Sequence, residues 1–176
     1  MSERDSEQIT SLSNNLKPLT LVFIRCHWGF LIGPKDERGE QVPGMRYHVK
    51  NIPVNGNVTW SFEEASLGNV RMAAALLVRL VIAKIEDEDR LEHILRFVPI
   101  VQGDPAWRCR TWLANALDAI ARDGKVVGTA ELAWRKIEPA ARKYVADKKS
   151  AGRYDAGQSM RSAPTLDLIE GKETVA

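Results

Sequence analysis

The sequence predicts an α+β fold in which an N-terminal antiparallel sheet of about four or five strands packs against C-terminal helices. Two observations lead to this prediction. Between residues 19 and 85, apolar residues occur in short runs rich in β-branched side chains, separated by the Gly, Pro and Asn residues that form turns. After residue 87, apolar residues recur at the spacing of amphipathic helices. Strands that precede helices, instead of alternating with them, are typical of α+β domains.

We expect four strands before residue 63, over residues 19–25, 28–32, 45–51 and 57–62. Turns separate them at Gly33-Pro34, within residues 35–43 and at Asn55-Gly56. The third strand alternates apolar and polar side chains, which puts His48 on its polar face. His27 opens the second strand, so a hairpin or meander brings the two histidines onto neighbouring strands.

The run over residues 73–85 fits either a strand or a helix. Its β-branched residues cluster toward the end, and we therefore favour a strand over residues 77–85 that is buried on both faces. A helix remains the alternative, because a short apolar run has no clear period.

Helical patterns follow the apolar run. Asp87 or Asp89 can cap a first helix, which Pro99 ends and whose apolar stripe is Leu91, Ile94, Leu95 and Val98. A last helical segment is expected over residues 129–148, with Pro139 either kinking it or opening a second helix.

Asp104-Pro105 is a strong signal for the start of the helix between these two, because an N-cap residue precedes proline at the first helical position. The helix is expected to run to about Arg122. Counted from this start, Cys109 lies at the fifth helical position, where the helix dipole and the arginines on either side favour a thiolate. The same count places Cys109 on an apolar stripe, so a buried and inert core cysteine is the alternative. The stripe continues with Leu113, Ala116 and Ile120.

A histidine and a cysteine far apart in sequence can form the site of a cysteine nucleophile. His27 can serve as the general base, and His48 can orient its imidazole. Gln102, in the loop before the cysteine, can donate its amide to an oxyanion together with helix-start N–H groups. For each of these three residues a purely structural role is the alternative. Cys26 points away from His27 and is expected in the core.

Length and composition suit one domain. The chain has 176 residues, of which 44% are hydrophobic. We expect the domain to span residues 18–149, because residues 1–17 are polar and residues 150–176 are small and polar. The first segment is expected to be a disordered arm and the last a flexible tail.

Charge and motif content argue against several classes of function. The 25 basic and 23 acidic residues give a formal net charge of +2, which does not indicate a nucleic-acid partner. No metal or cofactor is expected, because paired metal-ligand spacings and glycine-rich phosphate loops are absent from the sequence. The chain has two cysteines, no signal-peptide pattern, and no apolar run of the roughly 20 residues that cross a bilayer. We therefore expect an intracellular, cytoplasmic protein.

The segment His27-Trp28-Gly29-Phe30-Leu31-Ile32-Gly33 resembles the His-Trp-x-x-Tyr-x-Gly strand of the circularly permuted NlpC/P60 group, which includes lecithin:retinol acyltransferase-like proteins. The resemblance implies a permuted papain-like fold, with His27, His48 and Cys109 as catalytic residues in that order. The group's Asn-Cys-Glu-His-Phe motif is replaced here by Arg108-Cys109-Arg110-Thr111-Trp112. A closer resemblance, over roughly residues 19–154, is to a family of uncharacterised fungal proteins, and it implies no activity. Residues 47–51, 77–84 and 104–112 carry it.

Two functions follow as hypotheses. The first is a cysteine-dependent hydrolase or acyltransferase that attacks an amide, isopeptide or ester bond through Cys109, with His27, His48 and Gln102 assisting. The alternative is a non-catalytic interaction module that keeps the permuted papain-like fold and buries Cys109. The substrate, whether a small molecule, a lipid or a protein, stays open, as does the oligomeric state.

Overall fold

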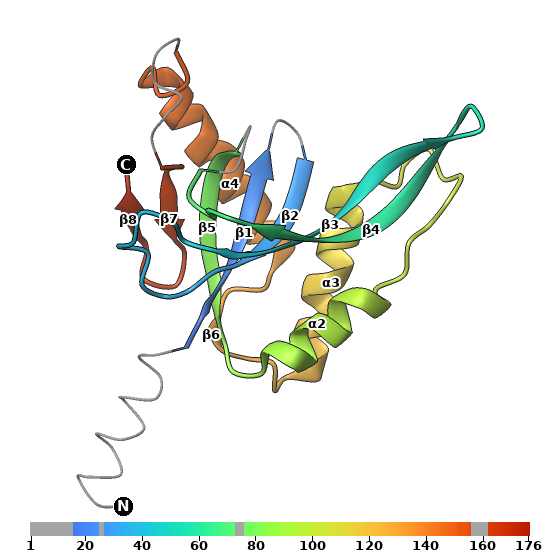
Figure 1. The fold of residues 1–176 in the computed structure, drawn as a ribbon, viewed down its shortest axis with the longest axis horizontal. Coiled ribbons are helices and arrows are strands. Elements are labelled where there is room, and N and C mark those ends of the chain that lie inside the picture. Colours follow the sequence, from blue (N-terminus) through green and yellow to red (C-terminus); the bar gives the residue numbers. More distant parts are fainter. Residues whose placement is uncertain (1–15, 25–26, 73–75, 156–161) are drawn as a thin grey trace, which may run out of the picture.

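The computed structural model describes residues 16–24, 27–72, 76–155 and 162–176. Within them the chain is an α+β structure, with one mixed sheet of eight strands and three helices (Figure 1). The strands are β1 (Pro18–Ile24), β2 (His27–Ile32), β3 (Gly44–Val54), β4 (Asn57–Leu67), β5 (Leu76–Ile85), β6 (Val127–Ala130), β7 (Thr165–Asp167) and β8 (Lys172–Val175), and the helices are α2 (Glu88–Phe97), α3 (Cys109–Asp123) and α4 (Trp134–Ser150).

The first five strands form the antiparallel part of the sheet, in the order β4-β3-β2-β1-β5. A two-residue turn joins β3 to β4, and both of its residues have positive φ, 49° at Asn55 and 79° at Gly56. This conformation suits a tight hairpin because its twist matches that of the strands. The turn pairs Val54 with Asn57 and continues in register to Gly44 and Leu67. The strands expected from the sequence are present, and β3 and β4 are longer than expected.

The ambiguous run forms strand β5, as favoured from its β-branched residues. β5 pairs antiparallel with β1 and parallel with β7. It therefore lies inside the sheet, and its apolar side chains meet other residues on both faces. This position explains why the run shows no alternation of apolar and polar residues.

Helix α2 begins as predicted, with the Asp87 side chain accepting a 2.9 Å hydrogen bond from the backbone N–H of Arg90. The predicted start of α3 at Asp104 is wrong. Asp104 Oδ1 accepts instead from the backbone N–H of Ala106 at 2.8 Å, and its carbonyl accepts from Trp107 N–H. These bonds close a local turn. Aspartate favours such turns as well as helix N-caps, so the same residue fits either structure. The helix then starts at Cys109, after an extended Arg108 at the N-cap.

The end of the chain differs from the sequence expectation. Residues 127–130 form strand β6 on the edge of β5, and α4 starts only at Trp134 and contains Pro139. Residues 165–175, expected from the sequence to lie in a flexible tail, form β7 and β8 and extend the sheet. Short polar strands leave little hydrophobic pattern. They form here because β5 offers unpaired backbone groups that a partner strand satisfies.

The sheet has an apolar cluster on each face. The main core, between the sheet and the helices, contains Leu21, Trp28, Phe30, Tyr47, Leu80, Cys109, Trp112 and Leu113. The second cluster contains Val22, Leu31, Val42 and Val70. Neighbouring residues of β1 and of β2 divide between the two clusters, as strand alternation requires. None of the helices in the described ranges has the length and apolar composition of a membrane span.

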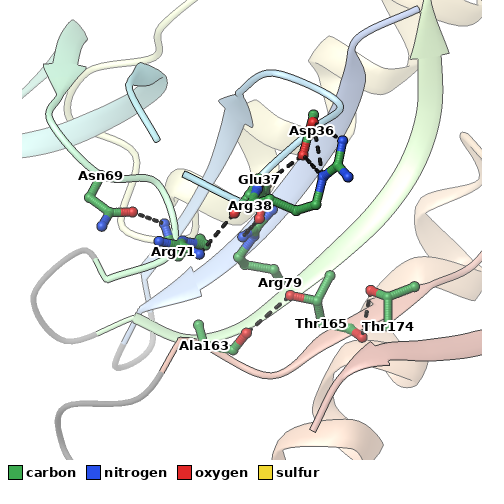
Figure 2. A network of polar contacts seen from close by, with 9 residues as sticks. All are labelled: Asp36, Glu37, Arg38, Asn69, Arg71, Arg79, Ala163, Thr165 and Thr174. Carbon is green, nitrogen blue, oxygen red and sulfur yellow. Dashed lines mark hydrogen bonds and ion pairs between the residues drawn. The ribbon is translucent and has the colours of Figure 1, made fainter. Parts of the chain in front are cut away.

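Two arginines on the second face hold the loop over residues 33–43 (Figure 2). Arg79 of β5 is only 3% exposed, and its guanidinium forms a two-bond ion pair with Glu37. Arg71 donates to the backbone carbonyls of Glu37, Gly39 and Glu40. The loop is thus fixed against the sheet by charge-assisted hydrogen bonds, which are stronger than neutral ones.

Replacing Glu37 by Ala should leave the buried Arg79 charge without its partner. We expect the free energy of unfolding to fall by about 3–5 kcal/mol, the range for breaking a buried ion pair, as measured by urea denaturation. Asp36→Ala is the matched control. Asp36 directly precedes Glu37, and its ion pair with Arg38 is exposed, so its loss should leave the midpoint of urea denaturation almost unchanged. Equal effects of the two substitutions would contradict the role assigned to Glu37.

Candidate active site

The candidate site lies where β2 and β3 separate. Pairing between these strands stops at Gly29 and His48, whereas β3 continues to pair with β4 as far as Val54. The β3–β4 hairpin therefore projects past the start of β2 (Figure 1). We call this place the fork, meaning residues 27–28 of β2 and 48–51 of β3.

Three side chains form a hydrogen-bonded chain at the fork, the Glu63–His48–His27 chain. His27 Nε2 lies 2.7 Å from His48 Nδ1, and His48 Nε2 lies 2.7 Å from Glu63 Oε2. The strands position these groups, because His48 pairs directly with Glu63 across β3 and β4 and lies diagonally from His27 across β2 and β3. Two cations approach the carboxylate: Lys50 is bonded to it, and Arg46 lies 3.8 Å away.

The surroundings set the charge state of this chain. The hydrogen bonds from Lys50 and His48 lower the pKa of Glu63 to about 2. Burial, together with the charges of His48 and Arg46, lowers the pKa of His27 to about 4. Burial also lowers the pKa of His48, although Glu63 acts in the opposite direction. At neutral pH the chain therefore consists of an ionised carboxylate and two neutral imidazoles.

The carboxylate also determines which imidazole nitrogens carry protons. An ionised Glu63 can only accept, so His48 must donate from Nε2, and its Nδ1 is then an acceptor. His27 must in turn donate from Nε2 to that acceptor. This leaves Nδ1 of His27 unprotonated, with a lone pair that can accept a proton. The hydrogen positions follow from this donor and acceptor pattern.

Gly29 allows the histidines to pack so closely. A Cβ atom at this position would lie 3.0 Å from Cβ of His48 and 3.0 Å from the carbonyl oxygen of Tyr47. A side chain there would therefore push His48 away from its position between His27 and Glu63.

Cys109 is the first residue of α3, not the fifth helical residue that the sequence predicts. The backbone N–H groups of Trp28, Arg110 and Cys109 itself, and the charge of Arg110, favour a thiolate at its sulfur. Burial has a larger effect and raises the pKa of the thiol. The residue is 6% exposed and packs into the main core. Cys109 therefore combines two features that the sequence left as alternatives, a position at a helix start and burial in the core.

One cleft, of about 760 Å³, is lined by residues of both motifs. Its lining residues are Phe23, His27, Trp28, His48, Lys50, Asn51, Trp60, Arg108, Cys109, Arg110 and Arg142. His48 faces away from the helices, since its neighbours Tyr47 and Val49 pack into the main core, whereas Cys109 lies on the helix side. Among the hydrogen bonds of the described residues, none joins the Cys109 sulfur to an imidazole nitrogen.

Gln102 has a different set of partners from the one expected. Its Oε1 accepts from the backbone N–H of Trp60 at 2.9 Å, and its Nε2 donates to the carbonyl of Trp60 at 2.8 Å. Both ends of the amide are thus bonded to the edge strand β4, and Gln102 does not line the cleft. The helix-start N–H groups of Cys109 and Arg110 remain as donors at the thiol. Cys26 lies outside the described residues.

Glu63 is the residue that sequence reasoning missed. A usable signal exists, because a two-residue turn at Asn55-Gly56 sets the pairing of the whole hairpin and places residue 63 opposite residue 48. The described residues contain no group of three or more His, Cys, Asp or Glu side chains arranged to hold a metal ion.

The proton arrangement can be tested by ¹⁵N NMR of the imidazoles at pH 7. We expect both His27 and His48 to carry their proton on Nε2, because each hydrogen bond of the chain requires this tautomer. Glu63→Leu removes the acceptor and should mix the tautomers of both rings. A proton on Nδ1 of His27 in the wild-type protein would contradict the arrangement.

The lowered histidine pKa also links stability to pH. Between pH 6.5 and about 4, the unfolded chain binds a proton at His27 that the folded protein does not bind. The free energy of unfolding should therefore fall as the pH falls through this window. His27→Gln removes this contribution, and urea denaturation across the window should show a shallower fall. Identical pH profiles for the two proteins would count against the buried, neutral imidazole.

Comparison with known proteins identifies a family but no activity. No curated protein and no solved structure matches the chain. A family model described as a family of unknown function, DUF6914, matches residues 23–175. The match covers β2, β3, β4 and α3, and thus every residue of the candidate site. The chain belongs to this family of unknown function.

Proposed function

We propose that the protein is a cysteine-dependent hydrolase or acyltransferase that attacks the carbonyl carbon of an amide, isopeptide or ester. One observation carries this proposal: the helix-start thiol of Cys109 lines the same cleft as His27 and His48, which are hydrogen-bonded to each other and, through His48, to Glu63. A nucleophile, a base and a group that orients the base are the parts that cysteine catalysis needs.

The first step is attack by Cys109. Because burial keeps the thiol protonated, its proton must leave as the sulfur attacks, and Nδ1 of His27 is the acceptor. The sulfur–carbon bond forms, the leaving alcohol or amine takes the proton as its bond to carbon breaks, and a thioester remains. Water, or a second alcohol or amine, then attacks the thioester and gives a proton to Nδ1 of His27. The carbon–sulfur bond breaks, the leaving sulfur takes that proton, and the thiol is regenerated as the hydrolysed or transferred acyl group leaves. The reaction requires the thiol and the imidazole to come within hydrogen-bond distance of each other when substrate binds. Catalytic hydrogen bonds are often long in the free enzyme and shorten in the complex.

The remaining members of the chain stabilise the protonated base. When Nδ1 of His27 gains a proton, its Nε2–H already points at Nδ1 of His48. The positive charge can pass along this bond and then lies next to the ionised Glu63. His48 and Glu63 are therefore positioning residues, and they act on the thiol only through His27.

The oxyanion formed during attack needs hydrogen-bond donors. The backbone N–H groups of Cys109 and Arg110 lie at the positive end of the dipole of α3 and already face the sulfur. We assign the oxyanion to these donors, because Gln102 is bonded to Trp60.

The permuted papain-like architecture is part of this proposal. It is supported by the chain order, in which two histidines on adjacent antiparallel strands precede a cysteine at a helix start packed on the sheet. The resemblance to the circularly permuted NlpC/P60 group and to uncharacterised fungal proteins belongs to the same proposal.

The burial of Cys109 favours one other function, a non-catalytic interaction module. In that case the thiol is a core residue, and the polar chain stabilises the sheet. The two functions differ in what the native protein does to an activated acyl compound, since only the enzyme forms a thioester at Cys109.

The test is acylation by a p-nitrophenyl ester, with the adduct located by mass spectrometry. We expect the native protein to be acylated at Cys109, and Cys109→Ser to lose this adduct. His27→Gln should slow acylation by about 10²–10⁴-fold, the usual size of general-base catalysis. Glu63→Gln should slow it less, because the amide oxygen can still accept from His48.

Two substitutions serve as controls. Cys26→Ser keeps the proposed nucleophile, and His93→Gln changes an exposed histidine on α2, so both should react at the wild-type rate. If Cys109 reacts only after denaturation, and His27→Gln has no effect, the interaction module is the better account.

A further inference from the structure

We propose that the cleft selects a substrate with an anionic group, a carboxylate or a phosphate, close to the bond that Cys109 attacks. Arg108 is the residue assigned to bind that group. This inference rests on the proposed function for the reaction, but the charge of the cleft is a separate property and can be measured separately.

Positive charge gathers around the cleft. Four of the cleft's lining residues are cationic, and none is Asp or Glu: the cations are Lys50, Arg108, Arg110 and Arg142. The whole chain has a formal net charge of only +2, so the positive charge is concentrated here. Both histidines in the cleft are neutral at pH 7, because their pKa values are lowered. A concave site lined by one sign of charge attracts ligands of the other.

Three of the four cations already have carboxylate partners. Lys50 is bonded to Glu63. Arg110 and Arg142 share the carboxylate of Glu138, at 3.8 Å and 2.6 Å. These three charges are partly balanced by the protein itself.

Arg108 differs from the other three cations. Among the ion pairs of the described residues it has no carboxylate partner, and its one side-chain bond to another residue runs from Nη1 to the neighbouring carbonyl of Trp107, at 2.6 Å. A guanidinium has five N–H donors, so most of them stay available to a ligand. Arg108 is exposed, lines the cleft and directly precedes Cys109. An anion bound there lies beside the thiol, and the planar guanidinium can bind it with two parallel bonds.

Three large aromatic side chains also line the cleft. Phe23, Trp28 and Trp60 line it, and the Arg142 guanidinium lies 6.0 Å and 5.8 Å from the ring centres of Phe23 and Trp28. These rings offer apolar contact to the part of the substrate next to the anion. The substrate class is therefore an acyl compound with an anionic group and an apolar portion.

The experiment compares three p-nitrophenyl esters of matched chain length, with acyl groups that end in a carboxylate, a phosphonate or a methyl ester. We expect kcat/KM to be about tenfold or more higher for an anionic ester than for the methyl ester, as a charge-assisted bond provides. The advantage should shrink when the salt concentration is raised to about 0.5 M. The better of the two anionic esters identifies the anion.

Arg108→Gln should bring the ratio of kcat/KM for the anionic and neutral esters close to one. Arg122→Gln, in the groove between α2 and α3 and away from the cleft, is the matched control and should keep the wild-type ratio. Equal turnover of all three esters by the wild-type protein would overturn the anion preference and leave the proposed function standing. Turnover of none of them would overturn the proposed function.

A binding measurement decides the inference even without turnover. Calorimetry on the Cys109→Ser variant compares glutarate and phenylphosphonate with the neutral glutaramide. We expect an anion to bind more tightly than glutaramide, and the added Arg108→Gln substitution to remove the difference. Equal binding of the anions and the amide would overturn the inference.

Discussion

The pairing register of β3 with β4 is the constraint on which the candidate site depends. Asn55 and Gly56 close a two-residue turn with positive φ at both positions, and this sets every pair along the two strands. A shift by one residue would turn each side chain of one strand to the other face. His48 would then lose Glu63, and the buried Tyr47 would leave the core. The same packing that stabilises the sheet therefore also holds the polar chain together.

In the resting protein, the atoms proposed to react are uncharged. Burial keeps both the Cys109 thiol and the His27 imidazole neutral, while the only charge in the chain lies on Glu63, at the opposite end of the chain from His27. In the proposed reaction, proton transfer from sulfur to imidazole creates two charges at once. Helix-start N–H groups favour the negative charge, and Glu63 favours the positive one. Burial outweighs both effects, since the pKa of the Cys109 thiol is raised and that of His27 is lowered, so the surroundings favour the neutral resting state.

Sequence reasoning predicted the α+β fold, the first five strands and α2, because their apolar periodicity and capping residues are local signals. It failed where a distant contact decides: β7 and β8 exist because β5 has an open edge, and the amide of Gln102 meets Trp60 because a loop passes the edge of β4. The start of α3 was wrong because Asp104 suits a turn as well as a helix cap. His27, His48 and Cys109 line one cleft, whereas Glu63 required the hairpin register.

The central claim is that the Glu63–His48–His27 chain serves the sulfur of Cys109. The most direct measurement is a crystal structure of the native protein after reaction with a small chloromethyl ketone that mimics an acyl substrate. We expect a covalent bond to Cys109, with Nδ1 of His27 within hydrogen-bond distance of the sulfur and Nε2 still bonded to His48. An unmodified Cys109 in the native protein, or an adduct that His27 does not approach, would contradict it.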